Sequence, residues 1–324
     1  MDTINKFQTL IILLSVSVGI SLGQVSFFEL HSEYFILPFL VIMLYTVFIQ
    51  IPLSDIKDSL KNLKFTFTAI SINFIWTPIF AWMLGYFFLN DSPEIWIGFL
   101  MLMVTPCTDW YLIFTGIAKG NVALGSSILP TNFILQILLL PIYLFALGGS
   151  LVEIDVASLV EGLVYVLILP LLLAYFSRKL ILRLKDNDYL EQILIPRLAS
   201  FQGIFLNLAI VAMFASQGKL LIDNYSILLM LLLPILIFFT VNFILVQVIG
   251  RLLKFEYEDL VALNLTTLAR NSPIALAIAV ASFSDKPLIA LALIIGPLIE
   301  LPVLATISQI LIMTKSITAS QDIV

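Results

Sequence analysis

Long apolar runs separated by short polar clusters dominate the chain. A transmembrane α-helix needs about 20 apolar residues to cross a hydrocarbon core of roughly 30 Å. Runs that reach or approach this length cover residues 7–23, 34–51, 63–89, 95–118, 121–147, 158–176, 199–215, 226–249, 260–283 and 288–313. The pattern predicts an all-α integral membrane protein with ten transmembrane helices, forming a single membrane unit over residues 1–324.

The distribution of basic residues supports this count. Lys and Arg near transmembrane helices stay on the cytoplasmic side. With ten spans, the termini and the loops after spans two, four, six and eight share one side, and 13 of the 16 Lys and Arg lie there. Lys219 and Lys286 lie on the other side, and Arg270 falls inside a span. We therefore expect a multi-pass protein of the cell (plasma) membrane with cytoplasmic N- and C-termini.

Composition excludes several classes of protein. The chain is 61% hydrophobic and 11% charged, whereas soluble domains are about 45–50% apolar and about 25% charged. One cysteine and one histidine exclude an intrachain disulfide and the common zinc sites. We expect no metal, no cofactor, no nucleic-acid partner and no enzymatic activity, because the sequence has no aspartate dyad, Ser–His pair or HExxH motif. A channel is an alternative that composition leaves open.

Two runs carry a polar interruption that contains proline, at residues 105–109 (TPCTD) and 266–273 (TTLARNSP). The halves, about 1–150 and 151–324, hold five spans each and start on opposite sides, which is the parity of an inverted-topology repeat. Irregular backbone at membrane depth is tolerated only where it lines protein or water. We therefore expect broken helices 4 and 9 to cross at the midplane and to hold a polar solute, as in alternating-access carriers.

Three ionisable residues are predicted to lie deepest in the membrane: Asp109, Arg270 and Glu300. Each costs roughly 2.5–3.5 kcal/mol at a helix centre unless it is paired or hydrated. Asp109 and Arg270 lie in the two interruptions, so an ion pair between them is expected, either purely structural or active in substrate or proton handling. Glu300 has no evident cation in the sequence, and since burial favours a protonated carboxyl group, it is the candidate for proton coupling.

The uncharged polar residues of these spans are candidates for contact with the solute. The soft sulfur of Cys107 suits a thiophilic solute, although a buried cysteine can also be inert packing. Buried amides need hydrogen-bond partners, so the asparagines either join helices or bind the solute. The predicted substrate-binding residues are Cys107, Thr108, Asn132, Asn271 and Ser272.

Several of these segments resemble a known superfamily. The fourth-helix signature of arsenite permeases is similar to residues 106–108 (PCT) together with residues 118–121 (AKGN). Their tenth-helix signature is similar to residues 296–303 (GPLIELPV), and its glutamate falls at Glu300. Asn271 matches a ninth-helix asparagine and Asn132 a fifth-helix asparagine. The chain thus resembles the bile acid/sodium symporter and arsenite permease superfamily. The resemblance implies a core of helices 3–5 and 8–10 and a panel of helices 1, 2, 6 and 7.

Departures from these patterns shape the functional prediction. The chain has Pro106 and Pro273 where arsenite permeases have arginine and glutamate, and Thr266 and Arg270 where the sodium-coupled branch has two sodium ligands. A fixed guanidinium strongly repels a sodium ion at contact distance. The resemblance implies a secondary active transporter for arsenite or antimonite efflux, coupled to proton antiport. The alternative is a sodium- or proton-coupled symporter for a bile-acid-type organic anion, which would dock on Arg270.

Overall fold

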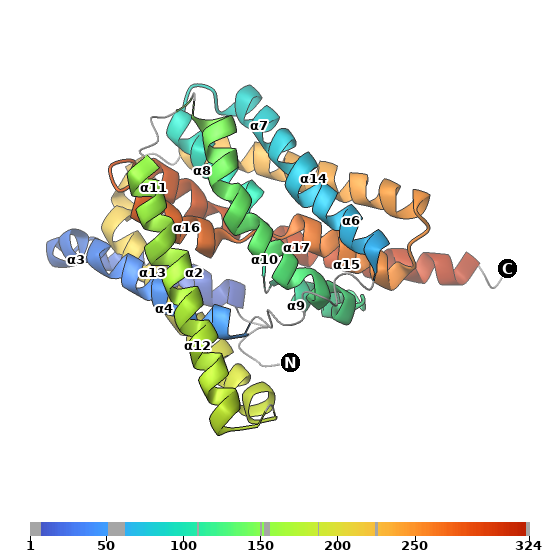
Figure 1. The fold of residues 1–324 in the computed structure, drawn as a ribbon. Coiled ribbons are helices and arrows are strands. Elements are labelled where there is room, and N and C mark those ends of the chain that lie inside the picture. Colours follow the sequence, from blue (N-terminus) through green and yellow to red (C-terminus); the bar gives the residue numbers. More distant parts are fainter. Residues whose placement is uncertain are drawn as a thin grey trace. The chain divides into compact units, whose positions relative to one another are not determined.

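The computed structural model describes residues 8–50, 62–108, 110–149, 151, 156–186, 188–223 and 226–321. Within these ranges the protein is helical and has no strand (Figure 1). The elements are α2 (Gln8–Leu22), α3 (Ser26–His31), α4 (Glu33–Gln50), α6 (Leu63–Ser71), η2 (Ile72–Trp76), α7 (Thr77–Phe88), α8 (Pro93–Val104), α9 (Trp110–Ile117), α10 (Val122–Tyr143), η3 (Leu144–Gly148), α11 (Val156–Leu163), η4 (Val164–Ile168), α12 (Leu169–Leu184), η5 (Tyr189–Leu194), α13 (Ile195–Asp223), α14 (Ser226–Leu252), α15 (Tyr257–Leu268), α16 (Ser272–Ser282) and α17 (Pro287–Gln321).

Helices occupy every apolar run that the sequence pattern singles out. Among the described residues, 7 helical stretches are long and apolar enough to cross a membrane on their own. The first run forms α2, which has only 15 residues, and the fourth and ninth runs are each divided into two shorter helices. The all-helical membrane architecture is therefore confirmed, whereas ten crossings arranged as an inverted repeat stay a prediction.

Backbone contacts divide the chain into two compact units. The first unit comprises Met1–Pro52, Glu153–Leu229 and Pro273–Ile294, and the second comprises Leu53–Val152, Met230–Ser272 and Ile295–Val324. The first interruption, residues 266–272 of the second interruption, and Glu300 belong to the second unit, and Pro273 begins the last segment of the first unit. The candidate site can therefore be described within that unit alone.

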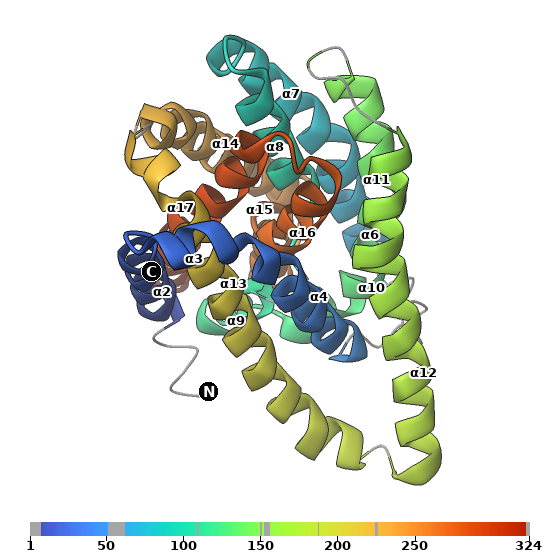
Figure 2. The same cartoon turned by 90° about the vertical axis from the view of Figure 1, so that its left-hand side faces the viewer.

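In the first unit, α4 lies alongside α13 (Figure 2). Gln50 donates a hydrogen bond to Gln202 at 3.0 Å across this pair. Helix α2 also packs on α13, and it does so closely: a Cβ atom added at Gly19 would lie 2.6 Å from the Cβ of Phe214. The seventh run, which is as short as the first, is thus part of a 29-residue helix that organises this unit.

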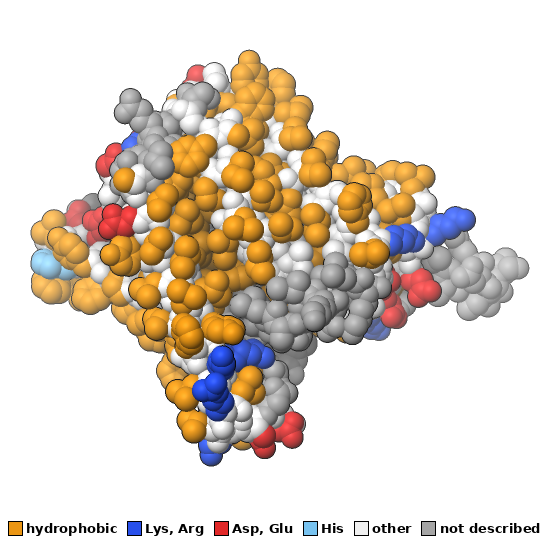
Figure 3. Space-filling view, in the orientation of Figure 1, with side chains coloured by type: hydrophobic (Ala, Val, Ile, Leu, Met, Phe, Trp, Pro, Cys, Tyr) orange, Lys and Arg blue, Asp and Glu red, His pale blue; other side chains and the backbone are white. Residues whose placement is uncertain are grey.

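Exposed apolar side chains cover the outer surface of α12. Leu172, Leu173 and Phe176 are about half exposed or more, at 49%, 52% and 61%, and Figure 3 shows hydrophobic side chains along this helix. Basic residues, including the exposed Arg183, gather at its C-terminal end (Figure 3). An apolar surface that ends in a basic cluster is typical of a membrane helix whose end lies at the membrane surface.

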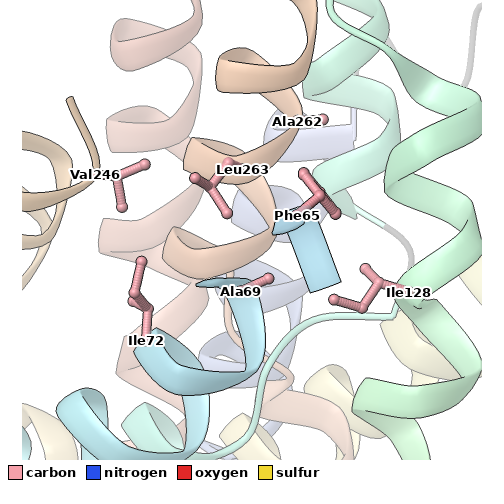
Figure 4. Close-up of a cluster of buried hydrophobic side chains, with 7 residues drawn as sticks. All are labelled: Phe65, Ala69, Ile72, Ile128, Val246, Ala262 and Leu263. Atoms are coloured by element: carbon pink, nitrogen blue, oxygen red, sulfur yellow. The ribbon is translucent and has the colours of Figure 1, made fainter. Parts of the chain in front are cut away.

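An apolar cluster fixes α15 within the second unit (Figure 4). Its members come from α6, η2, α10, α14 and α15, and all are buried. They are Phe65, Ala69, Ile72, Ile128, Val246, Ala262 and Leu263. Because protein interiors are close-packed, this cluster holds the first half of the ninth run in a fixed position, and the candidate site begins where that half ends.

A short π-helix, η2, interrupts the third run just before Pro78. Proline has no backbone N–H, so the carbonyl of Phe74 lacks its usual donor four residues later. The hydroxyl of Tyr143, on α10, donates to this carbonyl at 2.6 Å. Single-turn π-helices often occur at functional sites, and η2 carries Asn73, whose role is described below.

Replacing Tyr143 with phenylalanine is expected to lower the free energy of unfolding by about 1–3 kcal/mol, because the carbonyl of Phe74 would lose this donor in a buried position. The thermal unfolding midpoint of the purified protein in detergent measures the effect. Tyr165→Phe is the control, since the Tyr165 side chain is 56% exposed. Equal midpoints for the two variants would show that the hydroxyl of Tyr143 does not stabilise the bend.

Candidate functional site

The fourth and ninth runs both break where the sequence predicts. Helix α8 ends at Val104 and α9 begins at Trp110, while α15 ends at Leu268 and α16 begins at Ser272. Proline disfavours the helical conformation of the residue before it, and Thr105, which precedes Pro106, has extended φ and ψ angles of −106° and 96°. Pro273 lies in the first turn of α16, where its missing N–H costs nothing.

The two interruptions pair with each other through their backbones. The Cys107 N–H donates to the carbonyl of Ala269 at 3.0 Å, and the Asn271 N–H donates to the carbonyl of Thr105 at 2.7 Å. Pro106 and Arg270 face each other in this short antiparallel bridge. Segments more than 150 residues apart in the chain therefore cross, as the sequence pattern predicts.

The side chain of Arg270 closes the ends of both half-helices. The last carbonyls of any α-helix have no partner within the helix. Here Nη1 donates to the carbonyl of Met103 in α8 at 2.8 Å. In α15, Nε donates to the carbonyl of Leu268 at 3.0 Å, and Nη2 donates to that of Thr267. Nη2 also donates to the side-chain oxygen of Asn73 at 3.3 Å.

Electrostatics explains why a charged group is stable at this position. Arg270 is only 1% exposed, and an unpaired buried charge is very costly. Each helix C-terminus carries roughly −0.5 elementary charge, so two such ends together offset one guanidinium. The Phe238 ring lies 5.2 Å from Cζ of Arg270 and adds a cation–π contact. The partner expected from the sequence, Asp109, lies outside the described residues, so that ion pair stays a prediction.

Glu300 adjoins the same crossing from α17. Its Oε1 accepts a hydrogen bond of 2.8 Å from the backbone N–H of Arg270, and its side chain is 3% exposed. Gly296, one turn earlier, allows α17 to approach α8, because an added Cβ would lie 2.6 Å from Cδ2 of Leu102. The sequence shows no cation near Glu300, whereas the structure places it against the backbone of the buried arginine.

The uncharged candidates lie around the crossing. Nδ2 of Asn271 donates to Oγ1 of Thr108 at 3.0 Å, which joins the two interruptions by side chains as well. Cys107 is not part of a disulfide, and it is 1% exposed. Ser272, at the start of α16, is 3% exposed. A thiol, hydroxyls and an amide are therefore concentrated where two backbones are bent.

Asn132 connects to the crossing through residues that the sequence analysis did not select. Its Nδ2 donates to Oγ1 of Thr266 at 3.3 Å. The carbonyl of Thr266 accepts from Nδ2 of Asn73 at 3.3 Å, and Asn73 in turn contacts Arg270. We call Asn73, Thr266 and Asn132 the polar seam. Asn73 could have been found as a lone amide in the third apolar run, in the segment before Pro78.

The protein combines apolar helices of membrane-spanning length with a buried polar crossing of two broken helices. Irregular backbone at membrane depth is characteristic of solute sites in transporters, so this combination defines a membrane transport protein. Comparison with protein families makes this specific. The model of the Sodium Bile acid symporter family matches residues 37–224, more than half of the chain, and the protein belongs to this family.

Individual relatives agree with this assignment. The arsenical-resistance protein Acr3 of Corynebacterium glutamicum is 24% identical over 82% of this chain and 74% of its own length. Acr3 of Alkaliphilus metalliredigens is 23% identical over 83% of this chain and 78% of its own length. An uncharacterized transporter of Synechocystis sp. is 26% identical over 96% of this chain and 88% of its own length. The resemblance seen in the motifs is thereby confirmed.

Proposed function

We propose that this transporter exports arsenite or antimonite across the plasma membrane. The observation that carries the proposal is the bonding of Arg270, because its guanidinium already donates four hydrogen bonds within the protein. Several other described side chains at the crossing are neutral and polar, namely the thiol of Cys107 and the side chains of Thr108, Asn271 and Ser272. Trivalent arsenite is largely neutral As(OH)₃ near pH 7, and a soft sulfur suits it.

In the proposed mechanism, proton antiport drives the export. Glu300 is the proton carrier, because it is a buried carboxyl group one hydrogen bond from the crossing. The core helices 3–5 and 8–10 move against the panel helices 1, 2, 6 and 7, and both termini are cytoplasmic. Sodium is not required, since the carbonyl oxygens that could coordinate a cation at the half-helix ends already bind the guanidinium.

The second candidate function is symport of a bile-acid-type organic anion, coupled to sodium or protons, and membership of the Sodium Bile acid symporter family favours it. An anion that accepts from more than one N–H group of Arg270 would have to replace backbone carbonyls that end two helices, because four of its five N–H groups already donate within the protein. That exchange leaves the carbonyls without donors in a buried place, which is costly. Uptake of taurocholate that depends on a sodium gradient would establish this function in place of arsenite export.

Everted membrane vesicles test the proposal. Vesicles with an acidic interior and the wild-type protein are expected to accumulate arsenite, and Cys107→Ala is expected to reduce the initial rate by at least about tenfold, because no other side chain in the chain supplies a thiol. Thr306→Ala, an exposed position on α17, is the control and should transport at the wild-type rate. Absence of accumulation by the wild-type protein would disprove arsenite export, and full activity of Cys107→Ala would exclude sulfur from the site.

A further inference from the structure

Helix α10 buries an amide that has no hydrogen-bond partner in the described part of the chain. Gln136 is 1% exposed, and neither its Oε1 nor its Nε2 has a hydrogen-bond partner among the described residues. Asn132 lies one turn before it and is fully buried, and its Oδ1 is likewise without a partner in the described part of the chain. Residues four apart on a helix point to the same face. Three buried polar atoms on one face of α10 are therefore available to a ligand.

These atoms are linked to the crossing. The Nδ2 of Asn132 bonds to Thr266 of the polar seam at 3.3 Å. Through Asn73, which bonds to both Thr266 and Arg270, the seam continues to the bent segments. Buried polar groups are normally satisfied, and each exception in a native structure needs an explanation. A group so close to the solute site is explained by a ligand that completes its hydrogen bonds.

The set of unpartnered atoms defines the chemistry of that ligand. Oδ1 of Asn132 and Oε1 of Gln136 accept hydrogen bonds, whereas the Nε2 of Gln136 donates them. A cation would satisfy the two oxygens and leave the donor unpaired, and an anion would satisfy the donor and be repelled by the oxygens. A hydroxyl group donates and accepts at once. The arrangement therefore fits a neutral solute that carries hydroxyl groups.

We propose that Asn132 and Gln136 form a subsite for the hydroxyl groups of the transported solute. This inference rests on the proposed function and extends it, because Gln136 belongs to none of the motifs of the sequence. In the subsite the two amide oxygens accept from hydroxyl hydrogens, and the Gln136 amide donates to a hydroxyl oxygen. Arsenous acid has three hydroxyl groups, enough to meet all three atoms.

Titration of arsenite into the purified wild-type and variant proteins in detergent tests the subsite. Gln136→Met keeps the length and flexibility of the side chain and removes both polar atoms. We expect it to bind arsenite about tenfold more weakly than the wild type, as loss of one well-made hydrogen bond implies. Its thermal midpoint without ligand should be equal or higher, because two unsatisfied groups disappear. Asn132→Leu is the second variant and should also bind about tenfold more weakly.

Ser282→Ala is the matched control, because the hydroxyl of Ser282 is also buried without a partner among the described residues but lies in the first unit. It should bind arsenite like the wild type. Unchanged affinity in whichever of Gln136→Met and Asn132→Leu folds would overturn the subsite while leaving arsenite export intact. A sodium-induced rise in the wild-type midpoint that Gln136→Met abolishes would also overturn it, in favour of a cation site. Lack of arsenite binding by the wild type would instead contradict the proposed function.

Discussion

Replacing Arg270 with alanine is expected to destabilise the folded protein by about 3–5 kcal/mol, the usual effect of removing one partner from a buried charged network. Four acceptors lose their donor at once: the carbonyls of Met103, Thr267 and Leu268 and the side chain of Asn73. These acceptors belong to both half-helix ends and to η2. We expect a large fall in the thermal midpoint and in the yield of monodisperse protein.

Chemical rescue distinguishes the guanidinium from the volume of the side chain. Millimolar guanidinium or methylguanidinium ions should raise the midpoint of Arg270→Ala and leave the wild type unaffected. Arg251→Ala is the control, since Arg251 is an exposed residue in the last turn of α14. An Arg270→Ala midpoint within a degree of the wild type would mean that the half-helix ends do not depend on this cation.

Glutamine in place of Glu300 is expected to abolish proton-driven transport while preserving the fold. The amide keeps an oxygen that can accept from the backbone N–H of Arg270, now 2.8 Å from Oε1, but it cannot exchange a proton near neutral pH. If Glu300 carries the proton, the initial rate of arsenite accumulation under an imposed pH gradient should fall by roughly 100-fold, a typical effect of removing a proton-transfer group. Arsenite binding to the purified variant should stay within a few-fold of the wild-type affinity.

The pH dependence provides the decisive comparison. Wild-type transport should respond to the size of the pH gradient, and the residual transport of Glu300→Gln should not. Glu258→Gln is the control, because Glu258 lies in the first turn of α15, outside the predicted spans. If the transport rate of Glu300→Gln still depends on the pH gradient, a group other than Glu300 carries the proton.

Much of the architecture follows from hydrophobicity alone. An apolar run long enough to cross a bilayer has few alternatives to a helix, because every backbone polar group must be satisfied inside the segment. The two breaks were predictable for a local reason, namely proline beside polar residues at 105–109 and 266–273. The pairing of the two segments was expected from the predicted inverted repeat of the halves, and that repeat itself stays a prediction.

The partners within the site could not be predicted from the sequence. The ion pair of Arg270 with Asp109 stays a prediction, because Asp109 lies outside the described residues, and backbone carbonyls at two helix ends provide most of the described contacts of Arg270. Every residue has a backbone carbonyl, so no sequence pattern marks those that accept from Arg270. The sequence marks Asn73 only as a lone amide in its apolar run and Gln136 only as a second amide one turn after Asn132. The contacts of both residues become clear only when their neighbours in space are known.

The pairing of the two bent segments is made by main-chain atoms of Thr105, Cys107, Ala269 and Asn271. These main-chain bonds do not depend on the side chain at position 107, which can therefore vary in polarity and size. Position 108 has less freedom, because the hydroxyl of Thr108 accepts a hydrogen bond from Asn271 and joins the same two segments. In the proposed function, the thiol of Cys107 specifies selectivity whereas main-chain atoms specify the joint, so a change of transported compound would require no redesign of the helices that carry it.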